Sequence, residues 1–281
     1  MMNEYSELND DAFSSDSDDT EFQDLLAKAI QGAAAAQNSL GEWYYNGEGV
    51  TRDYEKFVYW CTKAAEQGNA VAQKNMGVCY SNGYGVEKDL EKAVDWYTKA
   101  AEQGNAVAQR NLGICYSNGY GVEIDLEKAI YWYTKSAEQG DDWAQYNVGD
   151  CYSNGEGVAR DLEKAVYWHT KSAEQGNAAA QHNVAFFYLN GYGVEKDLEK
   201  AFYWLTKAAE QGDASAQVNV GYCYQHGEGV EKDLEKAVYW YTLAAEQGDA
   251  PAQKNIAFCY YNGDGVAKDQ EKTVYWLTKA A

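Results

Sequence analysis

The sequence predicts an all-α fold, a solenoid of stacked helix-loop-helix repeats. The motif Tyr-x-x-Gly-x-Gly-Val-x-x-Asp occurs seven times in 281 residues. Its first glycine recurs every 36 residues, at Gly47, Gly83, Gly119, Gly155, Gly191, Gly227 and Gly263. A fixed period of this length is the mark of an architecture in which each repeat contacts its neighbours. We therefore expect one continuous elongated domain of about seven repeats.

Each repeat is predicted to contain two helices separated by a glycine loop. In the unit that starts at Asn69, this asparagine is a good N-cap for a first helix over about 70–81. Asp89 is placed to cap a second helix, and Gly104 supplies its C-terminal stop. The second helix carries apolar residues at spacings of three and four, including Trp96. This tryptophan recurs in all seven repeats, so we interpret it as a core anchor between helix layers.

The glycine loop itself could hold a phosphate or a metal, or it could be only a turn. In the second repeat it reads Gly83-Tyr84-Gly85-Val86. It lacks the Lys-Ser/Thr of a phosphate loop, and it lacks the alternating oxygen ligands of a calcium loop. A ligand loop is normally a single insertion, whereas this one is copied seven times. The pattern therefore favours a structural turn, and no motif predicts a metal or a cofactor.

Composition excludes some classes of partner. The chain has a formal charge of −21 and a pI near 4.4, which argues against binding to nucleic acid or to an anionic membrane surface. No segment approaches the ~18 apolar residues that a membrane helix needs. The N-terminus lacks the basic and apolar regions of a secretory signal. These features predict a cytoplasmic protein with no membrane insertion.

Cysteine usage supports the same compartment. Five of the six cysteines occupy one position in different repeats, namely Cys79, Cys115, Cys151, Cys223 and Cys259. Trp43 and Phe187 fill that position in two other repeats, so we interpret it as an apolar core position. Equivalent positions in neighbouring repeats are too far apart for a disulfide, which needs Cα atoms within ~7 Å. Cys61 lies elsewhere and could approach Cys79. Free thiols in a reducing compartment are expected.

The repeat resembles the Sel1-like repeat, a relative of the tetratricopeptide repeat with a longer inter-helix loop. The match extends over residues 34–281 and is carried in the second repeat by Ala72, Gln73, Gly77, Tyr80, Gly83, Gly85, Val86, Asp89, Lys92, Ala93, Trp96, Lys99, Ala100, Ala101 and Gly104. Ala185 and Ala257 depart from the pattern at the first-helix glycine. The resemblance implies a right-handed α/α superhelix of seven repeats. It also implies an adaptor that brings other proteins together.

The predicted boundaries follow from the period. Residues 1–21 contain eight acidic residues and no basic one, so we expect an acidic disordered tail, in which Ser14, Ser15 and Ser17 are candidate phosphorylation sites. Residues 22–33 resemble the end of a second helix without its tryptophan, as a degenerate N-terminal capping helix would. The repeats are expected at 34–69, 70–105, 106–141, 142–177, 178–213, 214–249 and 250–281. The last repeat has no polar capping helix, which allows end-to-end self-association.

Positions that vary between repeats indicate where a partner could bind. In the first helix they are the positions of Val71, Lys74, Val78 and Ser81, whose spacing of three, four and three forms one stripe. In a superhelix of the resembled kind, first helices line the concave side. The stripe is aromatic in the later repeats, as a peptide-binding groove would be. The predicted contacts are Trp143, Tyr146, His182, Phe186, Leu189, Tyr222, Gln225, Lys254, Phe258 and Tyr261. The alternative is that these residues pack against a neighbouring helix.

A position in the second helix also varies, and we expect it to flank the groove. It is occupied by Tyr97, Tyr133, His169, Leu205, Tyr241 and Leu277. The three histidines, His169, His182 and His226, stand at three different repeat positions, without metal-ligand spacing and without a nucleophile partner. The sequence therefore predicts no catalytic residues and a non-enzymatic adaptor for a protein or peptide. Two alternatives stay open: a repeat protein with β-lactamase-like hydrolase activity, and a self-assembling structural protein.

Overall fold

The computed structural model describes residues 16–281, with side chains from Thr20 onward, and this part of the chain is all-α. It forms two compact units, unit 1 up to Asp141 and unit 2 from Asp142 to Ala281. Unit 1 contains α1 (Asp16–Ile30), α2 (Ala34–Asn46), α3 (Tyr54–Glu66), α4 (Ala70–Asn82), α5 (Leu90–Glu102), α6 (Ala106–Asn118) and α7 (Leu126–Glu138). Unit 2 contains α8 (Asp142–Asn154), α9 (Leu162–Glu174), α10 (Ala178–Asn190), α11 (Leu198–Glu210), α12 (Ala214–His226), α13 (Leu234–Glu246), α14 (Ala250–Asn262) and α15 (Gln270–Lys279).

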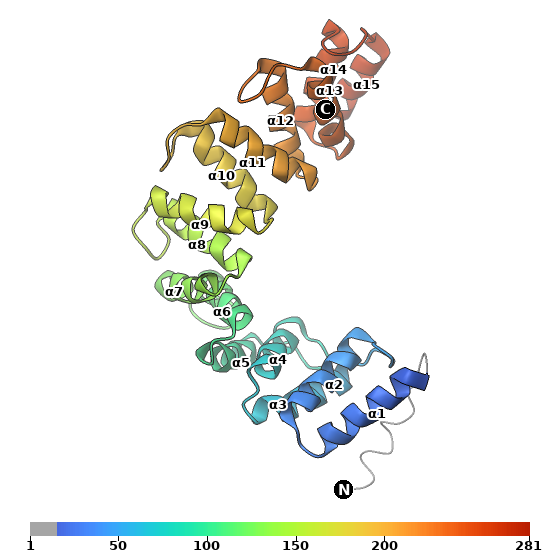
Figure 1. Cartoon of the computed structure of the whole chain (residues 1–281), viewed down its shortest axis with the longest axis vertical. Coiled ribbons are helices and arrows are strands. Elements are labelled where there is room, and N and C mark those ends of the chain that lie inside the picture. Colours follow the sequence, from blue (N-terminus) through green and yellow to red (C-terminus); the bar gives the residue numbers. More distant parts are fainter. Residues whose placement is uncertain (1–15) are drawn as a thin grey trace. The chain divides into compact units, whose positions relative to one another are not determined.

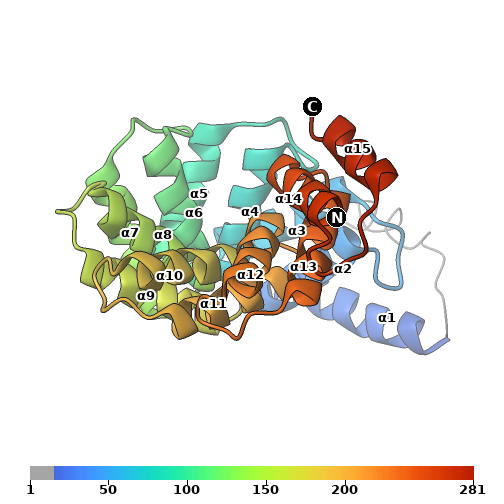
Figure 2. The same ribbon diagram turned by 90° about the horizontal axis from the view of Figure 1, so that it is seen from above.

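Within each unit, helices that follow one another in the chain pack together. Each even-numbered helix from α2 on contacts the second helix of its own repeat, as α8 contacts α9 and α10 contacts α11. The next contact is to the following repeat, as α9 contacts α10 and α11 contacts α12. Figure 1 shows this succession of hairpins as the colour runs along the chain, and Figure 2 shows the same hairpins from above. This nearest-neighbour packing confirms the predicted helical-repeat solenoid.

The helix ends are capped as the sequence predicts. Asn69 Oδ1 accepts a hydrogen bond from the backbone N–H of Ala72 at 2.9 Å, and Asp89 Oδ1 accepts from Lys92 at 3.0 Å. The first helix ends one residue later than expected, at Asn82, because Gly83 continues the terminal hydrogen bonds in a left-handed conformation with φ of 77°. The second helix begins at Leu90, directly after its cap. The same side-chain cap recurs at α6, α10, α12 and α14, whereas α2 follows Ala33 and has no side-chain cap.

The N-terminal helix begins earlier than the sequence analysis places it. The predicted tail covers residues 1–21, but α1 starts at Asp16, so residues 16–21 are helical. Acidic side chains in a first helical turn interact favourably with the positive end of the helix dipole. The acidic composition that indicates a tail therefore also suits a helix start. Residues 1–15 lie outside the described part of the chain, and so do Ser14, Ser15 and the side chain of Ser17.

The second glycine of each loop has a packing role. Gly85, Gly121, Gly193, Gly229 and Gly265 have φ between 65° and 71°. A methyl group on any of them would overlap the backbone carbonyl at the start of the second helix of the preceding repeat; Gly229, for example, lies against the carbonyl of Leu198. Only a residue without Cβ combines this conformation with this approach. In these repeats the glycine loop is thus an inter-repeat joint.

Second-helix residues pack on the glycines of the first helix. Gly77, Gly113 and Gly221 lie against the rings of Tyr97, Tyr133 and Tyr241. A Cβ atom added at Gly149 would lie 2.8 Å from the ring of His169. Where the first helix has Ala185, Leu205 packs in the same buried cluster, and the last repeat has the same two residue types at these positions, Ala257 and Leu277. A larger residue on one helix is thus matched by a smaller one on the other, which keeps the packing dense.

This pairing corrects one expectation. The second-helix position was predicted to flank the groove, but Tyr97, Tyr133, His169, Leu205 and Tyr241 are buried. Leu205 replaces a tyrosine where alanine replaces the facing glycine, whereas His169 still faces a glycine, Gly149. Leu277, on the last helix, is the exposed member of the set.

The cysteines also lie in the core. All six are free and buried, and burial raises the pKa of Cys115, Cys223 and Cys259 to about 11. These thiols stay protonated near neutral pH and act as small apolar side chains, as predicted.

A ladder of glutamines joins the repeats. Gln103 Nε2 donates to Gln73 Oε1 at 2.6 Å, and Gln73 Nε2 donates to the carbonyl of Ala65 at 3.1 Å. The ladder continues with a constant separation of 30 residues, as in Gln139 to Gln109, Gln175 to Gln145, Gln211 to Gln181 and Gln247 to Gln217. Each glutamine of a first helix is buried, so these bonds satisfy polar groups that would otherwise destabilise the interface.

Candidate functional site: the first-helix stripe of unit 2

The predicted contact residues lie on α8, α10, α12 and α14, all within unit 2. We call them, together with Asp150, the first-helix stripe. Five large aromatic side chains of the stripe are exposed: Trp143 (53%), Phe186 (51%), Tyr222 (45%), Phe258 (58%) and Tyr261 (63%). The helices pack without burying these rings. At these five positions the rings therefore do not fill gaps against neighbouring helices, which was the alternative interpretation. Exposed aromatic side chains in a row are typical of interaction surfaces.

The other predicted residues are less alike. Tyr146, His182, Leu189 and Gln225 are half-buried, and Lys254 is exposed. Gln225 Oε1 accepts a hydrogen bond from the buried hydroxyl of Tyr241 at 2.7 Å, which gives Gln225 a structural role. The His182 ring nitrogen Nε2 lies 3.4 Å from Asn219 Nδ2 on the next first helix. Among the aromatic rings, Trp143 and Tyr146 contact one another with centroids 6.1 Å apart.

A polar cluster that the sequence analysis did not predict lies beside these rings. Asp150 on α8 and His169 on α9 face one another, with Oδ1 and Nε2 3.4 Å apart. His169 is fully buried, and this burial lowers its pKa to about 4, so the ring is neutral near pH 7. Burial also raises the pKa of the Asp150 carboxyl. His169 was expected on a helix flank, and the structure places it in the core.

The cluster contains incompletely satisfied polar atoms. Nδ1 and Nε2 of His169 and Oγ of Ser153 are buried without a hydrogen-bond partner among the described residues. At the equivalent places in unit 1, the hydroxyl of Tyr97 lies 3.3 Å from Ser81 Oγ, and Tyr133 bonds Ser117 Oγ at 3.0 Å. A signal for the cluster was therefore present in the sequence. It is the replacement of tyrosine by histidine in one repeat, together with a carboxylate on the stripe.

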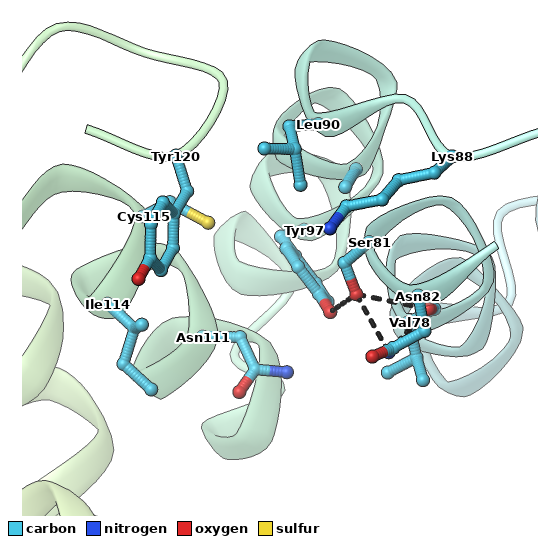
Figure 3. Close-up of a pocket in the computed structure, with 11 residues that line it drawn as sticks. Val78, Ser81, Asn82, Lys88, Leu90, Tyr97, Asn111, Ile114, Cys115 and Tyr120 are labelled. Carbon is cyan, nitrogen blue, oxygen red and sulfur yellow. Dashed lines mark hydrogen bonds between the residues drawn. The ribbon is translucent and has the colours of Figure 1, made fainter. Parts of the chain in front are cut away.

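Unit 1 has a pocket at the corresponding helix faces. A cavity of about 540 Å³ opens between α4 and α6, with Val78, Ser81, Tyr97 and Ile114 in its wall. Figure 3 shows the hydrogen-bonded hydroxyls of Ser81 and Tyr97, with Asn111 and Tyr120 across the opening. Lys88 is the charged residue of the lining. The lining of the pocket is mixed in polarity.

A second row of exposed rings lies on the second helices. Tyr131, Tyr167, Tyr203, Tyr239 and Tyr275 are each about half exposed. Each packs edge-on against the tryptophan that follows it, with centroids 5.0–5.3 Å apart. The sequence analysis did not single them out, because a residue that recurs with the period resembles a packing residue. Their regular recurrence indicates a packing role, in which each tyrosine covers one face of the neighbouring tryptophan.

The described residues also include side chains of the types that bind metal ions. No group of three His, Cys, Asp or Glu side chains among them is arranged to hold a metal ion. His226 stacks on Tyr222 with centroids 4.0 Å apart, and its Nδ1 lies 3.0 Å from the carbonyl of Tyr222. Within residues 16–281, no helix combines the length and apolar character that crossing a membrane requires.

The comparisons with known proteins agree on the kind of repeat. A protein-family model described as the Sel1 repeat matches residues 34–69, 70–105, 106–141, 144–177, 178–213, 214–249 and 250–281. No curated protein sequence matches the chain. The chain is similar to a solved structure of a protective antigen present in uropathogenic Escherichia coli strains and displaying an SLR fold, with 37% identity and a TM-score of 0.90. That similarity covers 92% of this chain and 56% of the antigen chain. It is also similar to a Sel1 repeat protein from Oxalobacter formigenes, with 36% identity, a TM-score of 0.73, and coverage of 93% of this chain and 76% of that chain.

Proposed function

Because the chain belongs to the Sel1 repeat family, we propose that it is a non-enzymatic adaptor that binds a segment of a partner protein along the first-helix stripe of unit 2. Proteins of this family are generally protein-interaction scaffolds. The observation that carries the proposal is the row of exposed rings at Trp143, Phe186, Tyr222, Phe258 and Tyr261. The matched length is about half of the antigen chain, so the proposal concerns this chain alone.

The chemistry of the stripe suits a protein segment. Aromatic side chains offer large contact areas with few rotatable bonds, which is why they dominate the energetics of protein interfaces. Phe186, Tyr222 and Phe258 occupy the same position in successive first helices, so an elongated ligand could contact several repeats at once. A concave groove and a cytoplasmic location both stay predictions.

We expect the variant Trp143→Ala, Phe186→Ala, Tyr222→Ala to lose its partner in a crosslinked pull-down from host lysate. The matched control is Tyr167→Ala, Tyr203→Ala, Tyr239→Ala, which removes equally exposed rings from the second helices of the same unit. The control should capture what the unchanged protein captures. Circular dichroism verifies that both variants are folded. Equal capture by the stripe variant, or loss only in the control, contradicts the proposal.

A second candidate function is self-association through α15. Val274 (63%) and Leu277 (43%) are exposed on this helix. A second copy that covered α15 would bury these apolar side chains. In this case the mass from light scattering rises with protein concentration, and Leu277→Lys abolishes the rise. A constant monomer mass rejects this candidate.

A further inference from the structure

We propose that the partner segment carries an arginine or a lysine, and that this side chain binds the carboxylate of Asp150. The inference rests on the proposed function, because it names a chemical feature of the segment that docks on the first-helix stripe. It is carried by the position of Asp150, by the polar groups around it and by the rings beside it.

Comparison of the repeats shows that a carboxylate at this position is unusual. The equivalent residues are Val78, Ile114, Phe186, Tyr222 and Phe258 in the second, third and last three repeats. The first repeat has Glu42, whose Oε1 accepts from Asn38 at 3.1 Å and from Asn75 at 3.3 Å. The stacking of repeats therefore accepts an apolar residue at this place.

The hydrogen-bonding neighbours of Asp150 are neutral, and Glu156, which acts on its carboxyl electrostatically, is acidic. Asn183 Nδ2 lies 3.4 Å from Oδ1, and the hydroxyl of Tyr146 forms a hydrogen bond with the carboxyl. His169 is uncharged near pH 7, so it does not neutralise the carboxylate. In the described part of the chain no lysine or arginine forms an ion pair with Asp150. The side chain is 35% exposed, so a ligand can reach it.

The local structure carries an energetic cost that the fold does not explain. Of the five buried side-chain atoms without a hydrogen-bond partner in the described residues, three belong to Ser153 and His169, next to Asp150. In the second and third repeats, a tyrosine on the second helix bonds the serine at this place. Unsatisfied polar groups that gather at one surface position are typical of a functional site.

The surroundings favour a cation in particular. Trp143 and Tyr146 precede Asp150 by two turns and one turn on α8, so all three share one face of that helix. Phe186 stands one turn after Asn183 on α10, and Asn183 contacts the carboxylate. Aromatic faces attract ammonium and guanidinium groups, and the stem of such a side chain packs on the rings. The net charge of −21 adds long-range attraction for a basic segment.

The test uses peptides selected from a random 12-residue display library with the full-length protein. We expect the selected peptides to contain arginine or lysine among apolar residues. Fluorescence anisotropy should give at least tenfold weaker binding to Asp150→Asn, since truncating one partner of a charge pair has effects of this size or larger. Replacing the basic residue of the peptide by methionine should weaken binding equally, with no further loss when both changes are combined.

Two controls separate the site from general charge and from the proposed function. Glu174→Gln removes an exposed carboxylate from α9 of the same unit and should leave binding within twofold. Trp143→Ala with Phe186→Ala should also weaken binding. Peptides that need the two rings but bind Asp150→Asn as tightly as the unchanged protein overturn the inference and leave the proposed function standing. If no selected peptide depends on the rings or on Asp150 for binding, the inference and the proposed function are both wrong.

Discussion

Replacing Gly229 by alanine is expected to lower the free energy of unfolding by about 3 kcal/mol. Gly229 has φ of 71°, where an L side chain is strained by roughly 1–2 kcal/mol. The new methyl group would also overlap the carbonyl of Leu198, and overpacking of this kind costs typically 1–3 kcal/mol. That carbonyl belongs to backbone at the start of α11, so no side-chain rotation relieves the overlap.

Gly212→Ala provides the matched control. Gly212 has φ of 93°, but nothing lies within 4 Å of its added methyl group. Only the conformational strain remains, so a loss of about 1 kcal/mol is expected. Urea unfolding followed by circular dichroism compares the two variants, and hydrogen exchange tests whether protection falls first in α11 and α12. If both variants lose the same free energy of unfolding, the second glycine of the loop does not form the proposed contact between repeats.

Replacing His169 by tyrosine is expected to stabilise the protein and to remove part of its sensitivity to acid. Tyr97, Tyr133 and Tyr241 occupy this position opposite a glycine in other repeats, and Gly149 faces His169 in the same way. A tyrosine hydroxyl there should reach Ser153 Oγ, which has no hydrogen-bond partner among the described residues. Satisfying one buried polar atom typically contributes about 1 kcal/mol.

The acid sensitivity follows from the pKa of His169. Burial lowers this pKa from an ordinary value of 6.5 to about 4 in the folded protein. Above pH 6.5 the ring is neutral in both states and its burial has no titration cost. As the pH falls below 6.5, the histidine binds a proton in the unfolded state but stays neutral in the folded state. Stability is therefore lost until about pH 4. The expected loss from this residue is about 2 kcal/mol at pH 5.

Asp150 acts in the opposite direction, so the comparison must isolate the histidine. Its raised pKa means that the folded state binds a proton more readily than the unfolded state, which adds stability as the pH falls. Both proteins keep Asp150, so the difference between unchanged protein and His169→Tyr reports on residue 169. Urea midpoints at pH 7 and pH 5 measure it. An equal loss in both proteins on acidification shows that the buried ring does not titrate in this range.

The fold could be predicted closely because its determinants are local and repeated. Asn69, Asp89 and Gly83 are caps and stops whose roles depend on a few neighbouring residues, and the period copies them through the chain. The predicted start of the N-terminal helix was wrong, because acidic residues suit both a solvated tail and the first turn of a helix.

The candidate site was only partly accessible from the sequence. Variation between repeats identified the exposed rings from Trp143 to Tyr261. The same criterion misplaced the position of Tyr97 and Leu205, because variation there compensates the exchange of glycine for alanine across a helix pair. The contact between Asp150 and His169 joins two helices at a separation of 19 residues. It becomes visible in the sequence only when both repeat positions are compared together across the seven repeats.

The glutamine ladder has a consequence for how such a chain can change in evolution. The bonds that cross from one repeat to the preceding one, such as Gln73 to Ala65 and Gln217 to Ala209, have the same donor, the same acceptor and the same separation of eight residues. A gene duplication or deletion of 36 codons therefore joins surfaces that already fit, and it leaves no new amide without a partner. The number of repeats can therefore change with little effect on folding. Residues that differ between repeats, such as Asp150 and His169, are the ones that can give an individual repeat its own function.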